Sequence, residues 1–317
     1  VHVNIIGIES VIYGVTDIEI CCRYLTDWGL KLVSKNNKSS VFETIEKTTI
    51  NLRKADDTEL APLNCDMPFF EGSCGREVIW GVDNEDTLAS IRAELSKDRD
   101  IRETCDGTLH AVDDANNPLG FCVSERSIAN EIHPLVNSPG NPARINTPAN
   151  GAIPSLAIPA RIGHVVYSVP KDVDKKVEFY FQRLGFKLSD RIGDGAFFMR
   201  PAGSKDHHNL LLEGRGGKGL QHTAFEFRDF DQVMHRGLYM EEQGWKTHIG
   251  PTRHTVGSNY SWYIWAPVGG LFELISDMDI LDDNWKAGHA DPKKLGPPFS
   301  WYARPEQKNL KFGQAHE

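Results

Sequence analysis

The segment Ile162-Gly-His-Val-Val-Tyr-Ser-Val169 decides the fold, because a similar segment, Gly7-Ile-Glu-Ser-Val-Ile-Tyr-Gly-Val15, occurs earlier in the chain. Each is a short apolar run that ends in Val and precedes an acidic stretch rich in helix-capping residues. An amphipathic helix follows in both copies, and Gly29 or Gly185 then introduces an apolar stretch containing Lys-Leu. A glycine there suits the residue just beyond a helix C-terminus, with a strand behind it. The two halves therefore repeat a strand–helix–strand order.

Two further pairs of segments extend the repeat. Arg76–Asp83 resembles Gln221–Arg228, and Pro118–Glu125 resembles Gly270–Asp277, all being apolar runs typical of strands. Aligned positions are separated by offsets of 154, 145 and 152 residues, taken from three pairs: Ser10 with His164, Glu77 with His222, and Phe121 with Glu273. A near-constant offset indicates one tandem duplication with loops of different length.

The duplication predicts an α+β fold built from tandem βαβββ modules, two in each half. We expect each half to wrap into an open barrel, which gives two open-barrel domains. The predicted boundaries are an N-terminal domain without metal at 1–130, a linker at 131–160, a metal-binding catalytic domain at 161–281 and a C-terminal tail at 282–317.

Composition excludes several partners. The chain has 35 Lys and Arg against 44 Asp and Glu, a net charge of −9, so we expect neither nucleic acid nor an anionic membrane as a partner. No apolar run approaches the ~20 residues of a membrane helix, and the N-terminal stretch lacks the pattern of a secretory signal. The six cysteines lie in the first half and form no Cys-x-x-Cys pair, which favours reduced thiols and a cytoplasmic location.

Three polar residues stand in apolar strands of the second half. His164 shares a strand face with Val166, and His222 shares one with Ala224. Glu273 lies within Leu-Phe-Glu-Leu-Ile-Ser, where a carboxylate is costly unless it is paired or binds a metal. Two histidines and one glutamate from three strands can form a 2-His-1-carboxylate site with open positions, which suits Fe(II) that binds a substrate and dioxygen together.

The aligned first-half positions favour a functional role for this set. Taken singly, a strand histidine is more often a hydrogen-bonded structural residue than a ligand, and a lone glutamate can be salt-bridged. Ser10, Glu77 and Phe121 stand at the aligned positions, so the scaffold folds without a His/His/Glu set. We therefore predict a single metal, bound only in the second half.

A longer pattern ends at the same glutamate. It reads His254-Thr-Val-Gly-Ser-Asn-Tyr-Ser-Trp-Tyr263-Ile-Trp-Ala-Pro267-Val-Gly-Gly-Leu-Phe-Glu273, with Tyr263 nine residues after His254 and ten before Glu273. This spacing resembles the signature of the type I extradiol ring-cleaving dioxygenases of the vicinal oxygen chelate superfamily. Trp262 is the one departure, because the pattern prefers an aliphatic residue or Phe there. Together with the tandem halves and the other histidines, the resemblance covers nearly the whole chain.

The resemblance implies the vicinal oxygen chelate fold and extradiol, or meta, cleavage of a catecholic ring by O2, which yields a ring-opened semialdehyde-type acid. The metal would be Fe(II), with Mn(II) as an alternative, and its ligands would be His164, His222 and Glu273. The substrate would be a small catecholic molecule, and we expect a homo-oligomer.

Three further residues match catalytic positions of that family. His208 matches the general base and acid of the pocket, and the adjacent His207 is the alternative because strand parity does not say which side chain faces inward. His254 and Tyr263 match the pair that contacts bound dioxygen and the substrate hydroxyl.

Two other functions on this scaffold stay open: a metal-dependent isomerase or lyase of the glyoxalase kind, and a non-catalytic binding protein. Ligands in one half only, together with the His254–Tyr263 pair, favour the dioxygenase. Many family members that cleave bicyclic catechols carry Asn-Asp where this chain has Val256-Gly257, so the resemblance does not supply the substrate. Arg253 could orient an anionic substrate or pair with a nearby carboxylate.

Overall fold

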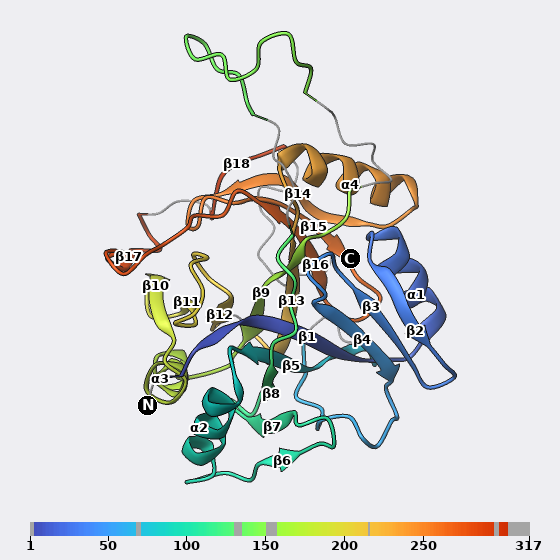
Figure 1. The fold of residues 1–317 in the computed structure, drawn as a ribbon, viewed down its shortest axis with the longest axis vertical. Coiled ribbons are helices and arrows are strands. Elements are labelled where there is room, and N and C mark those ends of the chain that lie inside the picture. The colour runs from blue at the N-terminus through green and yellow to red at the C-terminus, as the bar shows by residue number, and fades with distance from the viewer. Residues whose placement is uncertain are drawn as a thin grey trace.

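A computed structural model describes residues 3–67, 71–129, 135–149, 157–214, 216–294 and 298–303 (Figure 1). Parts of the predicted linker, 131–134 and 150–156, and parts of the predicted tail, 295–297 and 304–317, lie outside the described residues. No helix in these described ranges is both long enough and apolar enough to cross a membrane.

The first half forms one eight-stranded mixed sheet with strand order β2-β3-β4-β1-β5-β8-β7-β6. Its elements are β1 (Ile5–Val15), α1 (Ile18–Asp27), β2 (Lys31–Lys35), β3 (Ser39–Glu43), β4 (Thr49–Lys54), β5 (Cys74–Val82), α2 (Glu85–Leu95), β6 (Arg102–Glu103), β7 (Leu109–Val112) and β8 (Pro118–Val123). They make two successive βαβββ units.

The second half repeats this order in a ten-stranded sheet, β17-β10-β11-β12-β9-β13-β16-β15-β14-β18. Its elements are β9 (Arg161–Ser168), α3 (Val173–Arg183), β10 (Lys187–Ile192), β11 (Ala196–Arg200), β12 (Leu210–Glu213), β13 (Gly219–Glu226), α4 (Phe230–Glu242), β14 (Thr247–His254), β15 (Tyr260–Trp265), β16 (Leu271–Ser276), β17 (Gly288–Ala290) and β18 (Phe299–Tyr302). The predicted α+β fold of four βαβββ units is confirmed. Strands β17 and β18 belong to the predicted tail, yet they form the two edges of this sheet.

Local sequence explains where the helices begin and end. Asp17, Asn84 and Asp229 each accept a backbone N–H of the following helix through their side chains, which satisfies an otherwise unpaired donor. Gly29 and Gly185 follow α1 and α3 with φ of 95° and 68°, a left-handed conformation that glycine adopts without strain. The predicted glycine positions just beyond these two helices are therefore confirmed.

The two halves pack against each other reciprocally around a shared core. Trp28, which directly follows α1, contacts Phe225 and Phe272, which lie on β13 and β16 of the second half. In return, Phe186 of the second half packs edge-on against Trp80 of β5, with ring centroids 5.2 Å apart. Strand β1 lies beside β9, and β5 beside β13 (Figure 1). The first half therefore supports the back of the second sheet.

A shared irregularity fixes the alignment of the halves. In the β1–β5 pair, Glu77 stands opposite Ile12 and the ladder then skips one residue. In the β9–β13 pair, His222 stands opposite Val166 and the ladder skips at the same place. A bulge that recurs at one register position indicates a common origin of the two sheets and confirms that Glu77 matches His222.

The register corrects one predicted alignment. Ala224 of β13 stands opposite Glu273, and its counterpart Ile79 of β5 stands opposite Gly120. Gly120, and not Phe121, is therefore the first-half counterpart of Glu273. The apolar run of β8 carries no polar residue that could have fixed its register from the sequence.

Candidate metal centre

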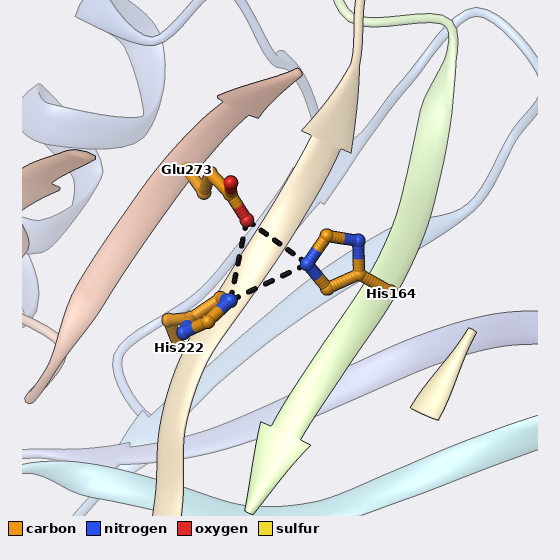
Figure 2. Close-up of side chains that lie close together, drawn as sticks. All are labelled: His164, His222 and Glu273. Carbon is orange, nitrogen blue, oxygen red and sulfur yellow. Dashed lines mark hydrogen bonds and ion pairs between the residues drawn. The ribbon is translucent and has the colours of Figure 1, made fainter. Parts of the chain in front are cut away.

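Three neighbouring strands bring the predicted ligands together. His164 lies on β9, His222 on β13 and Glu273 on β16, and their side chains point toward one another (Figure 2). Ala224 is the register partner of both His164 and Glu273, and His222 is two residues away on the same strand face. All three side chains thus project from one face of the sheet, and all three are buried.

The ligand atoms converge within a few ångströms. Glu273 Oε2 lies 2.9 Å from His164 Nε2 and 3.2 Å from His222 Nε2. The two Nε2 atoms are 3.3 Å apart. Among the described residues, this is the only group of three or more His, Cys, Asp or Glu side chains close enough to share one metal ion.

The residues present fit a divalent metal ion. Glu273 Oε2 is fully buried and has no hydrogen-bond partner of acceptable geometry in the described part of the chain, although two ring nitrogens lie beside it. Burial by itself would raise the pKa of Glu273, but the adjacent His164, His222 and His254 hold it well below its usual value. An ionised carboxylate with two imidazole nitrogens is a donor set that suits Fe, Mn or a similar transition metal.

A short hydrogen-bond chain orients His222. Its Nδ1 lies 2.6 Å from Gln221 Oε1, and Gln221 Nε2 donates to Glu213 Oε1 at 2.9 Å. A proton on Nδ1 leaves Nε2 free to bind a metal, which is a common way to fix the tautomer of a ligand histidine. Neither Gln221 nor Glu213 was predicted from the sequence. The available signal was a polar residue at each of these places in otherwise apolar strands.

The histidine doublet divides between two environments. His208 lines the pocket, with its ring centroid 4.3 Å from that of His164. Burial, with His164 and His207 nearby, lowers the pKa of His208 well below its usual value. His207 is buried outside the pocket lining, where its Nε2 lies 2.7 Å from Asp190 Oδ2. Of the two histidines, only His208 is thus exposed to a molecule in the pocket.

His254 and Tyr263 meet at the side of Glu273. His254 Nε2 lies 2.8 Å from the Tyr263 hydroxyl and 3.3 Å from Glu273 Oε1. Burial and the neighbouring Glu273 raise the pKa of Tyr263, so its hydroxyl stays protonated and can donate a hydrogen bond. Both side chains line the pocket beside the candidate ligands.

Apolar side chains line another part of the same pocket, and we call them the apolar wall. The apolar wall is a cluster of side chains that strands β9, β10, β11 and β12 supply. Its members are Val166, Ile192, Ala196, Phe198 and Leu211. Val256 and Pro298 also line the pocket.

Arg253 is turned to other partners. Its guanidinium pairs with Asp277 at 3.0 Å and stacks over the Tyr260 ring at 4.2 Å, and it does not line the pocket. Of the two roles considered for Arg253, the structure therefore supports the pairing with a local carboxylate.

Known proteins resemble parts of this chain in sequence. A family model described as the Glyoxalase/Bleomycin resistance protein/Dioxygenase superfamily matches residues 161–274. Metapyrocatechase 2 of Cupriavidus necator is 33% identical over 133 residues, or 41% of this chain and 41% of that protein, so the match spans less than half of either. The 2,2',3-trihydroxybiphenyl dioxygenase of Sphingomonas paucimobilis is 25% identical over 230 residues, or 68% of this chain and 74% of that protein.

Solved structures extend the likeness to nearly the whole chain. The 2,3-dioxygenase LapB from Pseudomonas sp. KL28 has a TM-score of 0.72 and 18% identity, covering 92% of this chain and 99% of that one. The Mn(II)-bound glyoxalase from Novosphingobium aromaticivorans has a TM-score of 0.71 and 21% identity, covering 92% and 89%. These likenesses confirm the vicinal oxygen chelate fold, which both proteins share with this chain. The family match therefore covers residues 161–274, whereas the likeness in fold extends over nearly the whole chain.

Proposed function

We propose that the chain is an extradiol dioxygenase, which opens a catecholic ring beside its two hydroxyl groups with O2 and releases a semialdehyde-type acid. His164, His222 and Glu273 would hold a non-haem Fe(II) ion. The observation that carries the proposal is the grouping of three kinds of residue around one pocket: a three-ligand set, a buried histidine outside that set, and a His–Tyr pair. The relatives named above, a metapyrocatechase and a trihydroxybiphenyl dioxygenase, support the same activity.

Different residues around the pocket would have different roles in the reaction. When bound, Fe(II) would supply sites for the substrate oxygens and for O2, and would make the catechol hydroxyls more acidic. His208 has a lowered pKa, so it is neutral near pH 7 and can accept a hydroxyl proton and later return it to a product oxygen. His254 and Tyr263 would donate hydrogen bonds to the negative charge that develops on oxygen. The apolar wall would hold the ring and exclude water.

Oxygen consumption separates this function from the glyoxalase-type alternative. Protein reconstituted with Fe(II) under anaerobic conditions is mixed with a panel of catechols, and O2 uptake is followed together with catechol loss. The proposal expects equal amounts of both and a yellow ring-opened product. Isomerisation of a substrate without O2 uptake would favour the isomerase, and binding without any conversion would favour the non-catalytic alternative.

Metal identity requires its own comparison. Two imidazoles and a carboxylate bind Mn(II) as well as Fe(II), so the ligand set does not choose between them. We propose Fe(II). Metal-free protein loaded separately with each ion should regain turnover with Fe(II), and recovery with Mn(II) alone would overturn this choice.

Self-association and a cytoplasmic location are further proposals. Residues 135–149 form a segment that projects from the two sheets (Figure 1) and is held by its own hydrogen bonds around Arg144. Val136 and Ile145 on this segment are 81% and 72% exposed, so we propose that a second copy of the chain covers them. Light scattering should report an oligomer that Val136→Asp weakens; a wild-type monomer would contradict the proposal. All six cysteines are unpaired, which supports a reducing compartment.

A further inference from the structure

We infer that Asp190 and His207 are positioning residues for His208: their hydrogen bonds keep the proton of the neutral His208 ring on Nδ1, so that its Nε2 is free to act in the pocket. This inference rests on the proposed function, because it explains how the acid–base group of the same pocket is oriented. It follows from a chain of contacts that leads from a partly exposed carboxylate to His208.

The chain of contacts has two hydrogen bonds. His207 Nε2 lies 2.7 Å from Asp190 Oδ2, and His207 Nδ1 lies 3.1 Å from His208 Nδ1. A carboxylate oxygen only accepts, so a neutral His207 ring carries its proton on Nε2 and its Nδ1 is an acceptor. His208 Nδ1 is then the donor of the second bond. The unprotonated Nε2 of His208 is the ring nitrogen that remains for a molecule in the pocket.

Asp190 is held by both neighbouring strands. On β10 it stands opposite Phe198 of β11, which lines the pocket, so the two side chains project from one face of the sheet. On its other side Asp190 stands opposite Gly288 of β17, whose N–H donates to Asp190 Oδ1. A Cβ atom on Gly288 would lie 2.6 Å from that oxygen, so this close approach requires glycine. One carboxylate oxygen is thus bound to the backbone, and the other is directed to His207.

The His207 ring is also held in place. The residue is buried, and its backbone N–H donates to the backbone oxygen of Asp279 at 2.8 Å. Its ring packs edge-on against Phe198 and Trp285, with ring centroids 5.9 and 6.2 Å apart. Backbone and ring contacts together hold His207 in the orientation that gives both of its nitrogens a partner.

Nitrogen NMR tests the proton positions without any turnover. The protein carries isotopically labelled histidine and is loaded with Zn(II), which is diamagnetic and binds the same kinds of donor. Signals are assigned by their loss in His207→Leu and His208→Phe. We expect the neutral His208 ring to be protonated on Nδ1 and the neutral His207 ring on Nε2. A His208 ring protonated on Nε2 would overturn the inference, whatever the activity.

Asp190→Asn keeps the size of the side chain and reverses one hydrogen bond. The amide oxygen can still accept the N–H of Gly288, which places the NH2 group against His207 Nε2. This group only donates, so the His207 proton moves to Nδ1 and opposes the Nδ1 proton of His208. We expect kcat of the iron-loaded protein to fall by about 10- to 100-fold, with iron content and anaerobic catechol binding unchanged. An unchanged kcat would overturn the positioning role.

The matched control for this substitution is Asp194→Asn. Asp194 is an exposed residue in the turn between β10 and β11, where it pairs with Arg191. The substitution removes one negative charge near the same strand without contact to either histidine. Iron content, catechol binding and kcat should all stay at the wild-type values.

Two substitutions at His207 separate hydrogen bonding from packing. Asn can place an amide oxygen near the position of Nδ1 and accept from His208, whereas Leu, which is similar in size, cannot. We expect kcat of His207→Asn to exceed that of His207→Leu by about tenfold at equal iron content, the scale of one hydrogen bond. Equal losses in both variants would mean that His207 only fills space, which would refute the assignment.

The outcomes for the hydrogen-bond chain and for ring cleavage are distinguishable. If the wild-type protein consumed no O2 with any catechol, the dioxygenase proposal would fail, while a proton on His208 Nδ1 would still sustain the chain. Ring cleavage by a protein whose neutral His208 carries its proton on Nε2 would do the reverse.

Discussion

The two halves of the molecule share one sheet topology, yet they treat a buried carboxylate in opposite ways. In the first half, Glu77 lies 2.7 Å from His110 Nδ1 and is thereby paired within the protein. In the second half, Glu273 Oε2 has no hydrogen-bond partner of acceptable geometry among the described residues and faces two ring nitrogens. The two halves have similar backbones. A few side chains therefore decide whether the buried carboxylate is paired within the protein or is available to a ligand.

The size of neighbouring side chains also differs between the halves. Glu273 stands opposite Ala224, whereas its counterpart Gly120 stands opposite Ile79. A Cβ atom on Gly120 would lie 2.5 Å from Ile79 Cδ1 and 2.9 Å from the backbone oxygen of Leu109. The first half therefore lacks a glutamate at this position and also lacks the space for one.

The largest expected effect comes from removing a ligand. His222→Ala should reduce bound iron from roughly one ion per chain to near zero and abolish O2 uptake, because two remaining donors hold the ion too weakly. The matched control is Glu77→Ala at the corresponding register position, which should leave the iron content unchanged. Elemental analysis of both variants makes the comparison. Iron loss from Glu77→Ala, or two ions in the wild-type chain, would show that the first half binds metal.

The next effect separates proton handling from metal binding. His208→Phe should keep the iron and lower turnover by a factor on the order of 10², the usual scale for a general acid–base group. Thr48 is the first-half counterpart of His208, because each lies two residues before a matched register position, Ile50 on β4 and Leu210 on β12. The Thr48 hydroxyl accepts a hydrogen bond from the N–H of Ile162. Thr48→Ser keeps this hydrogen bond and should change neither iron nor turnover.

Iron content and turnover measured on the same samples decide the assignment. Loss of iron from His208→Phe would make His208 a ligand. If neither quantity changed, the role would pass to His207, although that ring is bound to Asp190.

Much of this comparison could be predicted from the sequence, because strands that alternate in polarity reveal which side chains share a face. His164 and His222 stood out for that reason, and Glu273 stood out as a carboxylate within an apolar run. The match of Gly120 to Glu273 could not be predicted, because an apolar run has no polar residue to fix its register. Gln221 was missed because it occupies the bulge that the ladder skips. A bulge reverses the alternation on which such predictions depend.

A smaller effect is expected where the halves carry different partners at one register position. Tyr263 stands opposite Glu273, and His110 stands opposite Gly120. Tyr263→Phe removes the hydrogen bond to His254 and should lower turnover by about tenfold with iron retained. His110→Phe leaves the buried Glu77 without that partner and should cost about 1–3 kcal/mol of unfolding free energy with turnover retained. Denaturant unfolding and steady-state rates are measured on both, and a rate loss in His110→Phe would contradict the division of roles.

The smallest change in metal content is expected from grafting the ligands onto the first half. A chain with Ser10→His, Glu77→His and Gly120→Glu contains all three donors in register, yet it should still bind no second ion. The glutamate cannot take its place while Ile79 and the Leu109 oxygen occupy the space, and overpacking of this kind typically costs about 1–3 kcal/mol. Adding Ile79→Ala reproduces the Ala224 environment and should restore part of that stability. Iron analysis and unfolding of the triple and quadruple variants test this. A second ion in the triple variant would mean that the donors alone make the site, and no recovery of stability in the quadruple variant would mean that Ile79 is not the obstacle.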